Sequence, residues 1–405
     1  MKNKKLVRKI AIITPTLLIK GGTQNQLVNF ALECKKDGDI CEIFTFAYFP
    51  TETYNAFDQV KVNSVILLTS GSFLVRILRY LKIDLQSFFL YFSFFFESKF
   101  LNLLSNKKFD VLNPHDWFGT WIAVDAKRKF SLDSSIITML NDVPSFFSSK
   151  HSIKSYLSKI IDANKQSDVD SIMVLDNKMR SKVLQYYGSG HKIELVRSGI
   201  EIDRYKNLQF PKQHIRQSLG VAYSDFLFTC ASVPSPHRRF EDVILSLKDI
   251  SPTAKLLIIG DFKLSKKYGD SLKRLVYKLQ LENRVHFISK FLPSEQRAGY
   301  IASSDTYIFP NENQTWGLGV IEAMSLGVPC IVSNGAGVHE VLTSEDNALI
   351  YNVSKTAELT LCMKQIMNQK ILRNKLISNG KCFVVDNYSW SKYKDSVYSI
   401  FFLKK

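Results

Sequence analysis

The sequence predicts an α/β protein made of two doubly wound, parallel-sheet domains that face each other across a cleft. Three observations support this prediction. The chain has 405 residues, which is long enough for two domains of ordinary size. Short, apolar, β-branched segments alternate with amphipathic helical segments in both halves, as is typical of parallel sheets covered by helices. No unit of about 20 to 50 residues repeats along the chain, which disfavours a solenoid.

In the first half, a strand predicted at 9–14 (KIAIIT) enters a Gly-Gly turn and then a helix. The apolar residues of this helix keep the 3.6-residue period: Leu27, Phe30, Ala31 and Cys34. Further strands are predicted at 40–46, 109–116, 134–142 and 169–177. The alternation therefore predicts one complete doubly wound domain.

In the second half, the same rhythm restarts at DFLFTCAS. Strands are predicted within 225–232, 254–261, 284–289, 305–310 and 329–333, with helical stretches such as SLKRLVYKLQL between them. Charge and polarity rise in the segment before this restart. The predicted domains are therefore 1–206, 207–386, and a last amphipathic helix at 387–405 that returns to the first domain.

The net charge of the chain is +17, which favours anionic partners such as anionic lipid or phosphorylated small molecules. A Lys-rich composition without functional meaning explains the charge equally well. No nucleic-acid partner is expected, because the chain carries no recognisable module for one. The six cysteines form no C-x-x-C pair and are expected to be buried thiols in a reducing compartment.

Residues 71–104 combine basic and strongly apolar sequence. Glu97 and Lys99 interrupt the apolar run, which falls short of the roughly 18 to 20 residues of a membrane span. Two interpretations remain open: peripheral contact with a membrane, or a buried pair of aromatic helices.

The first 22 residues imitate a secretion signal, but Thr14, Pro15 and Thr16 interrupt the apolar run and no small-residue cleavage site follows. A first β-strand is the better interpretation. The protein is therefore expected in the cytoplasm, at the inner face of the membrane if residues 71–104 contact lipid.

The most informative stretch lies at 311–342, where a glycine-bearing turn leads into an apolar helix that carries Glu322. The N–H groups and the dipole at a helix start attract phosphate, and glycines allow close approach of the backbone. A carboxylate one turn into the helix can accept two hydrogen bonds from the neighbouring hydroxyls of a ribose. A capping or solvated glutamate is the less favoured alternative.

The sequence QTWGLGVIEAMSLGVPCIV, at 314–332, resembles the donor-site motif of retaining GT-B glycosyltransferases of family 4. That motif normally has two glutamates, followed by Ala-Met and Gly-x-Pro. The resemblance extends over most of the chain and is stronger in the second half. Its other parts are VRSGIEIDRY, HRRFEDVILSL, LLIIGD, RVHFIS, SSDTYIFPNENQ, GAGVHEVL and NYSW.

The resemblance implies roles for the residues of this motif. The second glutamate of the motif falls on Glu322, which is expected to hold the nucleotide ribose. The first falls on Gln314, a departure that removes a charge from the donor-sugar contact. The backbone of Gly317, Leu318 and Gly319 is expected to face the sugar and the phosphate.

The family also carries an arginine and a lysine that bind the diphosphate after the first strand of the second domain. Here these positions are Ser232, which brings no charge, and Arg238, whose planar guanidinium can still clamp phosphate. Arg239 and His237 are candidates to compensate for Ser232. Glu312 is a candidate to replace the missing glutamate, although it lies two positions too early.

In the first domain, Gly21 and Gly22 match the family's Gly-rich turn that meets the diphosphate. A plain strand-to-helix turn is the alternative. His115 resembles the active-site histidine near the donor sugar, although a lone histidine is more often structural. Asn141 and Asp142 follow another strand and are candidate acceptor contacts.

Two D-x-D patterns, at 168–170 and 37–39, imitate a metal-binding signature. The first leads into a predicted strand and the second ends a predicted helix, so neither is expected to bind a metal. No H-E-x-x-H, G-x-S-x-G or phosphate-binding G-x-x-x-x-G-K pattern occurs. The expectation is a metal-independent protein with no cofactor, in which a nucleotide-diphosphate sugar is a co-substrate.

The predicted function is transfer of a sugar, with retention, to a polysaccharide or lipid-linked glycan, with His115, Gln314 and Arg238 as the implied catalytic residues. Because Gln314 and Ser232 depart from the family, a sugar-nucleotide-binding protein with weakened catalysis is one alternative. A UDP-sugar epimerase is another, although the chain has only seven histidines for proton transfer. The sugar, nucleotide, acceptor and oligomeric state do not follow from the sequence.

Overall fold

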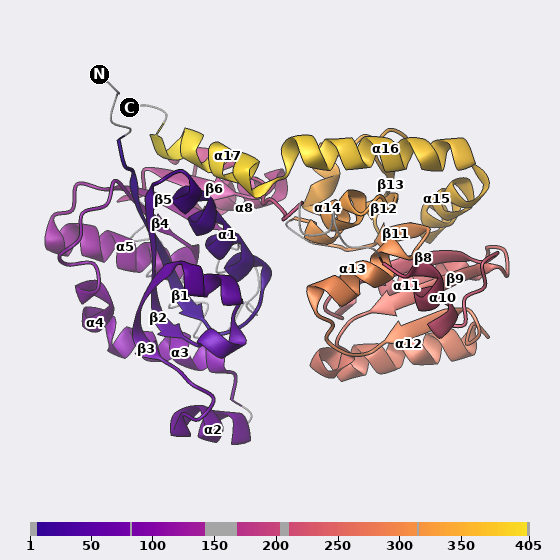
Figure 1. The fold of residues 1–405 in the computed structure, drawn as a ribbon, viewed down its shortest axis with the longest axis horizontal. Coiled ribbons are helices and arrows are strands. Elements are labelled where there is room, and N and C mark those ends of the chain that lie inside the picture. The colour runs from indigo at the N-terminus through magenta and orange to yellow at the C-terminus, as the bar shows by residue number, and fades with distance from the viewer. Residues whose placement is uncertain (1–5, 82, 142–167, 203–209, 314–315, 403–405) are drawn as a thin grey trace. The chain divides into compact units, whose positions relative to one another are not determined.

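The computed structural model describes residues 6–81, 83–141, 168–202, 210–313 and 316–402. Contacts divide the chain into two compact units, residues 1–197 with 390–405, and residues 198–389. Among the described residues, each unit contains one sheet in which every named strand pair is parallel (Figure 1). The prediction of an α/β fold with two parallel sheets is confirmed. The predicted boundary between 206 and 207 lies outside the described residues.

The described strands of the first unit are β1 (Lys9–Leu17), β2 (Ile40–Tyr48), β3 (Lys61–Leu67), β4 (Val111–Pro114), β5 (Ser135–Leu140), β6 (Ser171–Val174) and β7 (Ile193–Leu195). Their spatial order is β3-β2-β1-β4-β5-β6-β7. The order reverses between β1 and β4. In an open parallel sheet, such a reversal leaves a crevice for ligands beyond the carboxyl ends of the strands.

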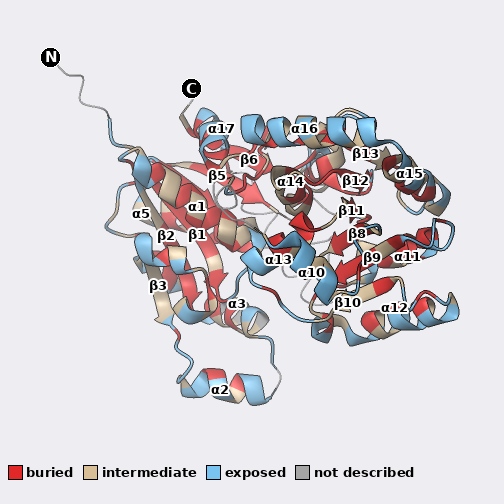
Figure 2. Cartoon of the chain, turned by 45° about the vertical axis from the view of Figure 1, so that its right-hand side comes forward, coloured by how far each residue is buried: buried red, intermediate tan, exposed pale blue. Residues whose placement is uncertain are grey.

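The helices of the first unit cover its sheet, and most strand residues are buried (Figure 2). Those in the described part of the chain are α1 (Gly22–Lys36), η1 (Pro50–Glu52), η2 (Asn55–Gln59), α2 (Phe73–Tyr80), α3 (Leu85–Phe95), α4 (Glu97–Asn102), α5 (Asp116–Phe130), α8 (Asn177–Tyr187) and α17 (Trp390–Phe402). Apolar strand side chains such as Ile13, Phe44 and Leu112 form a core with α3, α4 and α5. This packing holds the carboxyl ends of β1, β4 and β5 in place.

The last helix, α17, packs on α1 within the first unit. The ring of Phe30 meets the rings of Tyr393, Tyr398 and Phe401 edge-on, at centroid distances of 6.0 to 6.2 Å. Gln26 donates a hydrogen bond to the Tyr393 hydroxyl at 2.7 Å. The apolar face of α1 that the sequence predicts is therefore covered by residues from the far end of the chain.

The aromatic segment 85–104 belongs to the core of the first unit. Phe89 and Phe100 are fully buried, and Phe88, Phe92 and Phe96 pack against the same cluster. These contacts support the buried helix pair for the five rings, and peripheral membrane contact through residues 71–104 stays a prediction. Phe95, on the same helix, is 83% exposed.

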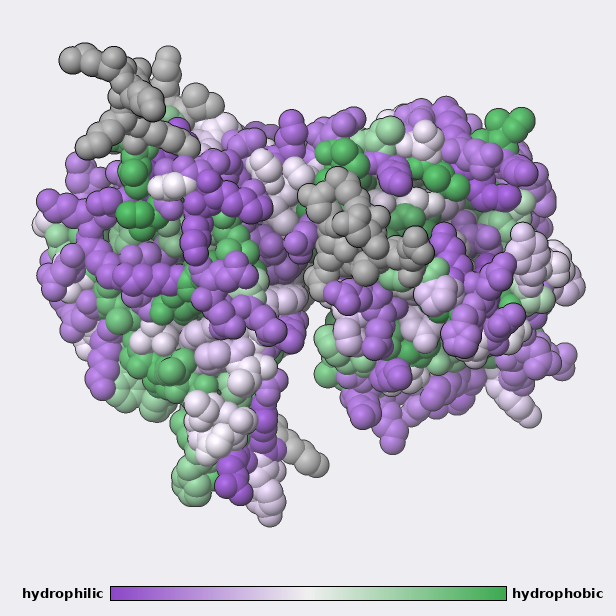
Figure 3. Space-filling model, in the orientation of Figure 1, coloured by the Kyte–Doolittle hydropathy of each residue, from purple (hydrophilic) through white to green (hydrophobic). Residues whose placement is uncertain are grey.

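Helix α2 projects from the body of the first unit (Figure 1). Val75 and Leu78 are buried, whereas Phe73, Tyr80 and Leu81 are 77%, 86% and 57% exposed. Figure 3 shows hydrophobic and hydrophilic side chains next to each other on this projection. Within the described ranges, every helix is too short or too polar to span a lipid bilayer.

The described strands of the second unit are β8 (Phe226–Ala231), β9 (Ala254–Ile259), β10 (Val285–Ile288), β11 (Thr306–Phe309), β12 (Cys330–Ser333) and β13 (Leu349–Tyr351). Their order is β10-β9-β8-β11-β12-β13. This order reverses between β8 and β11, so the loops after these two strands lie at the switch point of the second sheet.

The helices of the second unit include η4 (Pro236–Arg238), α14 (Leu318–Ser325) and η6 (Gly337–Val341), which border these loops. The others are α10 (Lys212–Ser218), α11 (Phe240–Leu247), η5 (Phe262–Ser265), α12 (Lys266–Lys278), α13 (Ser294–Ala302), α15 (Thr356–Asn368) and α16 (Lys370–Asn387). Residues such as Phe228, Leu256 and Ile331 of the strands form the core with α11, α12 and α15.

The cysteines are all free thiols, as their spacing predicts. Cys34, Cys230 and Cys330 are buried, whereas Cys382 is exposed on α16. The expectation of buried thiols is therefore wrong for Cys382.

Candidate functional site

Three loops meet at the carboxyl edge of the second sheet. The backbone N–H of Glu312, after β11, donates to the His237 carbonyl, after β8, at 2.8 Å. The hydroxyl of Ser333, at the end of β12, donates to the Asn311 carbonyl at 2.5 Å. These bonds join the segments on which the sequence places the second-domain candidates.

The start of α14 packs tightly on this edge because of two glycines. A Cβ at Gly317, the N-cap residue, would lie 2.6 Å from Cγ1 of Val338. A Cβ at Gly319 would lie 2.7 Å from the Tyr307 hydroxyl oxygen. Packing alone thus accounts for both glycines, and contact of their backbone or of Leu318, the first helical residue, with a phosphate stays a prediction.

Glu322 lies on α14 and its side chain is partly exposed. Nη2 of Arg297, on the neighbouring helix α13, donates to Oε2 at 3.1 Å and to Oε1 at 3.3 Å. A carboxylate has about four lone-pair positions, so this contact leaves acceptor capacity on both oxygens. The side chain that the sequence assigns to the ribose is thus a held carboxylate with room for more hydrogen bonds.

Tyr307 is a buried residue of β11 whose hydroxyl reaches the end of β8. Its hydroxyl donates to the Ala231 carbonyl at 2.9 Å. Burial raises the pKa of Tyr307 first, and Glu322 adds to the rise. Burial lowers the pKa of the Arg238 guanidinium, an effect that Tyr307 opposes. Glu322 lies on α14 and Arg238 ends η4, and these two helices border the loops at the switch point of the second sheet.

Arg239 and Glu312, candidates to replace the charges that Ser232 and Gln314 lack, already contact other side chains. Arg239 has a left-handed backbone and binds the buried carboxylate of Asp242 through Nε at 2.7 Å and Nη2 at 3.0 Å. Oε2 of Glu312 lies 3.6 Å from Nη1 of Arg239. Ser232 directly follows β8 and is partly exposed. These contacts give Arg239 and Glu312 structural partners, whereas Ser232 lies at the switch point.

Two predicted site residues, Gln314 and Asp142, lie outside the described residues. Their predicted contacts with the donor sugar and the acceptor stay predictions.

In the first unit, Gly21 and Gly22 lie at the start of α1, directly after β1. Gly21 is the N-cap residue and Gly22 the first helical residue. Within the described part of the chain, no side chain caps this helix start, and its first turn holds no acidic residue. An uncapped helix start presents N–H groups and the positive end of the helix dipole, which suits an anion.

His115 lies at the end of β4 and is buried, with its Nε2 3.2 Å from Oδ1 of Asn113. The Asn113 amide itself donates to the Ile137 carbonyl at 2.6 Å, which leaves Oδ1 as an acceptor. Burial lowers the pKa of His115 to about 3, so the ring is neutral at physiological pH. The tautomer that fits carries its proton on Nε2 and leaves a lone pair on Nδ1, for which the described residues supply no partner.

Asp116 is the neighbour of His115 and has a left-handed backbone, with φ of 61°. Its Oδ1 accepts a hydrogen bond from the backbone N–H of Asn141 at 3.2 Å. Burial raises the pKa of Asp116 to about 6, and the bond to Asn141 opposes this rise. The structure thus brings Asn141 to the same sheet edge as His115, next to an unpredicted carboxyl that titrates near neutral pH.

The two D-x-D patterns have structural partners. Asp168 pairs with Arg128 at 2.6 Å, and Asp170 accepts from the Ile136 N–H at 2.7 Å. Asp37 pairs with Lys394, and Asp39 accepts from Tyr398. Among the described residues, no group of three or more His, Cys, Asp or Glu side chains gathers as a metal site would require.

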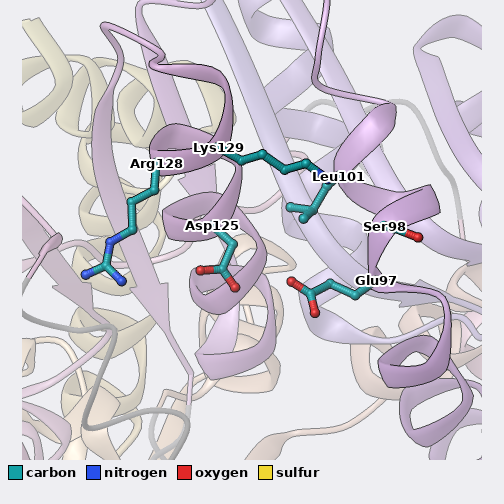
Figure 4. Close-up of a pocket in the computed structure, with 6 residues that line it drawn as sticks. All are labelled: Glu97, Ser98, Leu101, Asp125, Arg128 and Lys129. Carbon is teal, nitrogen blue, oxygen red and sulfur yellow. The ribbon is translucent and has the colours of Figure 1, made fainter.

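A hollow of about 530 Å³ lies between α4 and α5 (Figure 4). It is lined by Glu97, Ser98, Leu101, Asp125, Arg128 and Lys129. These α5 residues belong to the last turns of that helix, whereas His115 and Asp116 lie at its start. The hollow therefore contains none of the predicted site residues.

Three residues of these two edges were not predicted as functional: Arg297, Tyr307 and Asp116. Arg297 lies 25 positions before Glu322, on a helix without a motif. Tyr307 belongs to a strand that the sequence does predict, but its hydroxyl contacts depend on the neighbouring strand. Asp116 carries a local signal, because it follows His115 at a strand end, but its pKa depends on burial.

Two known families match this chain, one in its first half and one in its second half. The family described as Glycosyl transferases group 1 matches residues 211–383. The family described as Glycosyltransferase Family 4 matches residues 20–204. Together the two matches cover most of both units, and the chain belongs to the GT-B glycosyltransferases of family 4.

Curated relatives include proteins named as glycosyltransferases and as synthases. A glycosyltransferase of Methanocaldococcus jannaschii is 22% identical over 314 residues, covering 75% of this chain and 77% of that protein. Alpha-monoglucosyldiacylglycerol synthase of Streptococcus pneumoniae is 21% identical over 265 residues, covering 63% of this chain and 58% of the relative. N-acetyl-alpha-D-glucosaminyl L-malate synthase of Bacillus anthracis is 25% identical, and the match spans about half of it, 48%.

Solved structures share the fold. Anabaena HepE in complex with UDP has a TM-score of 0.76 at 17% identity, covering 97% of this chain and 99% of that one. WaaG, a glycosyltransferase involved in lipopolysaccharide biosynthesis, has a TM-score of 0.67 at 14% identity, covering 97% and 99%. The comparisons therefore support a transferase enzyme and do not favour the alternatives of a binding protein or an epimerase.

Proposed function

We propose that this protein transfers a sugar from a nucleotide-diphosphate sugar to a glycan or lipid-linked acceptor, with retention of configuration. The observation that carries the proposal is how α14, which carries Glu322, and the loop after β8, which carries Arg238, come together at one edge of the second sheet. The start of α14 packs on Tyr307, whose hydroxyl donates to the Ala231 carbonyl at the end of β8, and the loop after β11 bonds to the loop after β8 through Glu312 and His237. One carboxylate suits a ribose diol, and one guanidinium with a helix start suits a diphosphate. Solved complexes of Anabaena HepE with UDP and with UDP-glucose support a nucleotide-sugar donor.

In the proposed reaction, the bond from the anomeric carbon to the diphosphate breaks and a bond to the acceptor hydroxyl forms on the same face. The departing phosphate oxygen takes the acceptor's proton. Negative charge builds on the diphosphate, where Arg238 and the start of α14 stabilise it. No protein nucleophile, metal ion or cofactor enters this proposal.

His115 and Gln314 are proposed to contact the donor sugar. In the neutral ring of His115, Nε2–H points to Asn113 and the lone pair of Nδ1 accepts from a sugar hydroxyl. Gln314 donates and accepts hydrogen bonds without a charge. Asn141 and Asp142 are proposed acceptor contacts at the edge of the first sheet.

The first test measures donor binding. Thermal shifts with UDP, GDP, ADP and their sugars identify the nucleotide, and calorimetry then compares wild type with Glu322→Gln. A hydrogen bond to a charged group contributes about 1.5 kcal/mol or more, so we expect at least about tenfold weaker binding. Glu282→Gln, an exposed glutamate on the same unit, is the matched control. Equal affinities of wild type and Glu322→Gln would remove the ribose assignment.

The second test measures turnover as release of nucleoside diphosphate from the donor in the presence of a membrane extract. Wild type is expected to release it. Gln314→Glu is expected to leave nucleotide binding intact and to raise turnover. Binding without any release would support a protein that has lost catalysis.

We propose that the acceptor lies at a membrane and that α2 contacts the lipid. Phe73 and Tyr80 are exposed on this projecting helix, and Leu81 is exposed directly after it. Arg76 and Arg79 lie on the same helix, and Arg79 also pairs with Glu52 at 2.8 Å. Exposed apolar side chains next to arginines suit an anionic lipid surface, to which the charge of +17 is also attracted. The name of the Streptococcus pneumoniae relative supports a glycolipid product.

Sedimentation with vesicles tests this contact. We expect binding to phosphatidylglycerol vesicles, weaker binding to phosphatidylcholine vesicles, and loss of binding in Phe73→Ser/Tyr80→Ser. Tyr277→Ser, an equally exposed tyrosine of the second unit, is the control. Unchanged sedimentation of the double variant would exclude α2 as the lipid contact.

A further inference from the structure

We infer that Arg297 is a positioning residue that sets the orientation of the Glu322 carboxylate for the nucleotide ribose. This inference rests on the proposed function, because it takes Glu322 as the ribose contact. The two side chains come from different helices, α13 and α14, and no motif connects them. The inference therefore depends on the packing of these helices.

The geometry of the contact supports an orienting role. A single nitrogen, Nη2, contacts both carboxylate oxygens, at 3.1 and 3.3 Å. A donor nearly equidistant from two oxygens resists rotation of the carboxylate in either direction. Both side chains are partly shielded, with 33% exposure for Arg297 and 21% for Glu322, so solvent competes less than at an open surface pair.

The charge of Arg297 also suits a site for an anion. A lone carboxylate at this edge would repel the diphosphate that Arg238 is proposed to bind. Arg297 neutralises Glu322 and so lowers the repulsion between this carboxylate and the diphosphate. Ser232 supplies no positive charge at the position where the family has an arginine. Repulsion from an uncompensated Glu322 would therefore weaken diphosphate binding more strongly here.

Orientation of a carboxylate towards two hydroxyls has a specific readout. Removal of one ribose hydroxyl should weaken nucleotide binding only when the carboxylate is correctly placed. The ratio of the dissociation constants for 2′-deoxy-UDP and UDP therefore reports the position of Glu322. This ratio is insensitive to the fraction of protein that is folded and to the phosphate contacts that both nucleotides share.

The experiment measures this ratio by calorimetry for wild type, Arg297→Ala, Arg297→Lys and Glu322→Gln. We expect a ratio of about ten or more for wild type, since one hydrogen bond to a charged group is lost. Arg297→Ala is expected to lower the ratio to about threefold or less. Arg297→Lys keeps the charge without the planar guanidinium and is expected to give an intermediate ratio. Arg274→Ala, an exposed arginine on α12, is the control and should keep the wild-type ratio.

The possible outcomes separate the two hypotheses. A wild-type ratio that falls in Glu322→Gln but persists in Arg297→Ala would overturn the role of Arg297 and leave the proposed function standing. Tighter UDP binding by Arg297→Ala would also overturn it, because Arg297 would then compete with the ribose. A wild-type protein that binds neither UDP, GDP nor ADP would overturn the proposed function together with this inference.

Discussion

Gly319→Ala gives a sharp test of how α14 packs on the second sheet. The added methyl carbon would lie 2.7 Å from the Tyr307 hydroxyl oxygen, well inside ordinary contact. Tyr307 is fully buried and its hydroxyl is bonded to the Ala231 carbonyl, so the ring has little room to move. Overpacking costs about 1 to 3 kcal/mol. The better helix propensity of alanine offsets up to about 1 kcal/mol of this, so we expect a net loss of about 0.5 to 2 kcal/mol.

The second variant of this test is Tyr307→Phe, which removes the oxygen that the methyl would meet. The nearest remaining ring atom is Cζ, at 3.5 Å, an ordinary contact. By itself Tyr307→Phe loses the hydrogen bond to the Ala231 carbonyl, which costs about 0.5 to 1.5 kcal/mol. In the Tyr307→Phe background, Gly319→Ala should be neutral or slightly stabilising. The two changes should therefore be coupled by about 1 to 3 kcal/mol.

Urea unfolding of the four proteins, followed by circular dichroism, measures this coupling. Hydrogen exchange of the α14 amides then locates the effect in the second unit. If Gly319→Ala costs as much in the Tyr307→Phe background as in wild type, the hydroxyl is not what excludes a side chain at 319. The account of the glycines by packing would then be wrong.

Three further predictions use other parts of the structure. Because burial raises the pKa of Asp116 from 3.8 to about 6, its contribution to stability is full below about pH 4 and is lost as the pH rises through 6. Asp116→Asn should therefore stabilise the protein by about 1.5 kcal/mol more at pH 8 than at pH 5, and equal gains at both pH values in urea unfolding would contradict the pKa. A Cβ at Gly260 would lie 2.5 Å from a backbone oxygen, whereas Gly71 has open space. Gly260→Ala should lower Tm, whereas Gly71→Ala should not. Equal Tm values for the two variants would contradict the close packing at Gly260. Phe89→Ala should cost about 3 to 5 kcal/mol and Phe95→Ala less than about 0.5 kcal/mol. Similar losses in the two variants would show that α3 is not packed as described.

The sequence alone was sufficient for the fold class and for most strands. The signals it used are local: apolar runs of a few residues form strands, the 3.6-residue period forms amphipathic helices, and glycines mark the turns between them. These signals also placed Gly22 at the start of α1, His115 at the end of β4 and Glu322 on α14. Each of these placements needs only the nearest residues in the chain.

The tertiary structure decided which side chains meet. The pairing of Arg297 with Glu322 and the approach of Gly319 to the Tyr307 hydroxyl require the packing of α13, α14 and β11, which lie apart in the sequence. Phe89 and Phe95 lie on the same apolar helix, α3, yet Phe89 is fully buried in the core and Phe95 is 83% exposed. Burial and side-chain contact depend on through-space packing, whereas periodicity specifies only the local element and its apolar face.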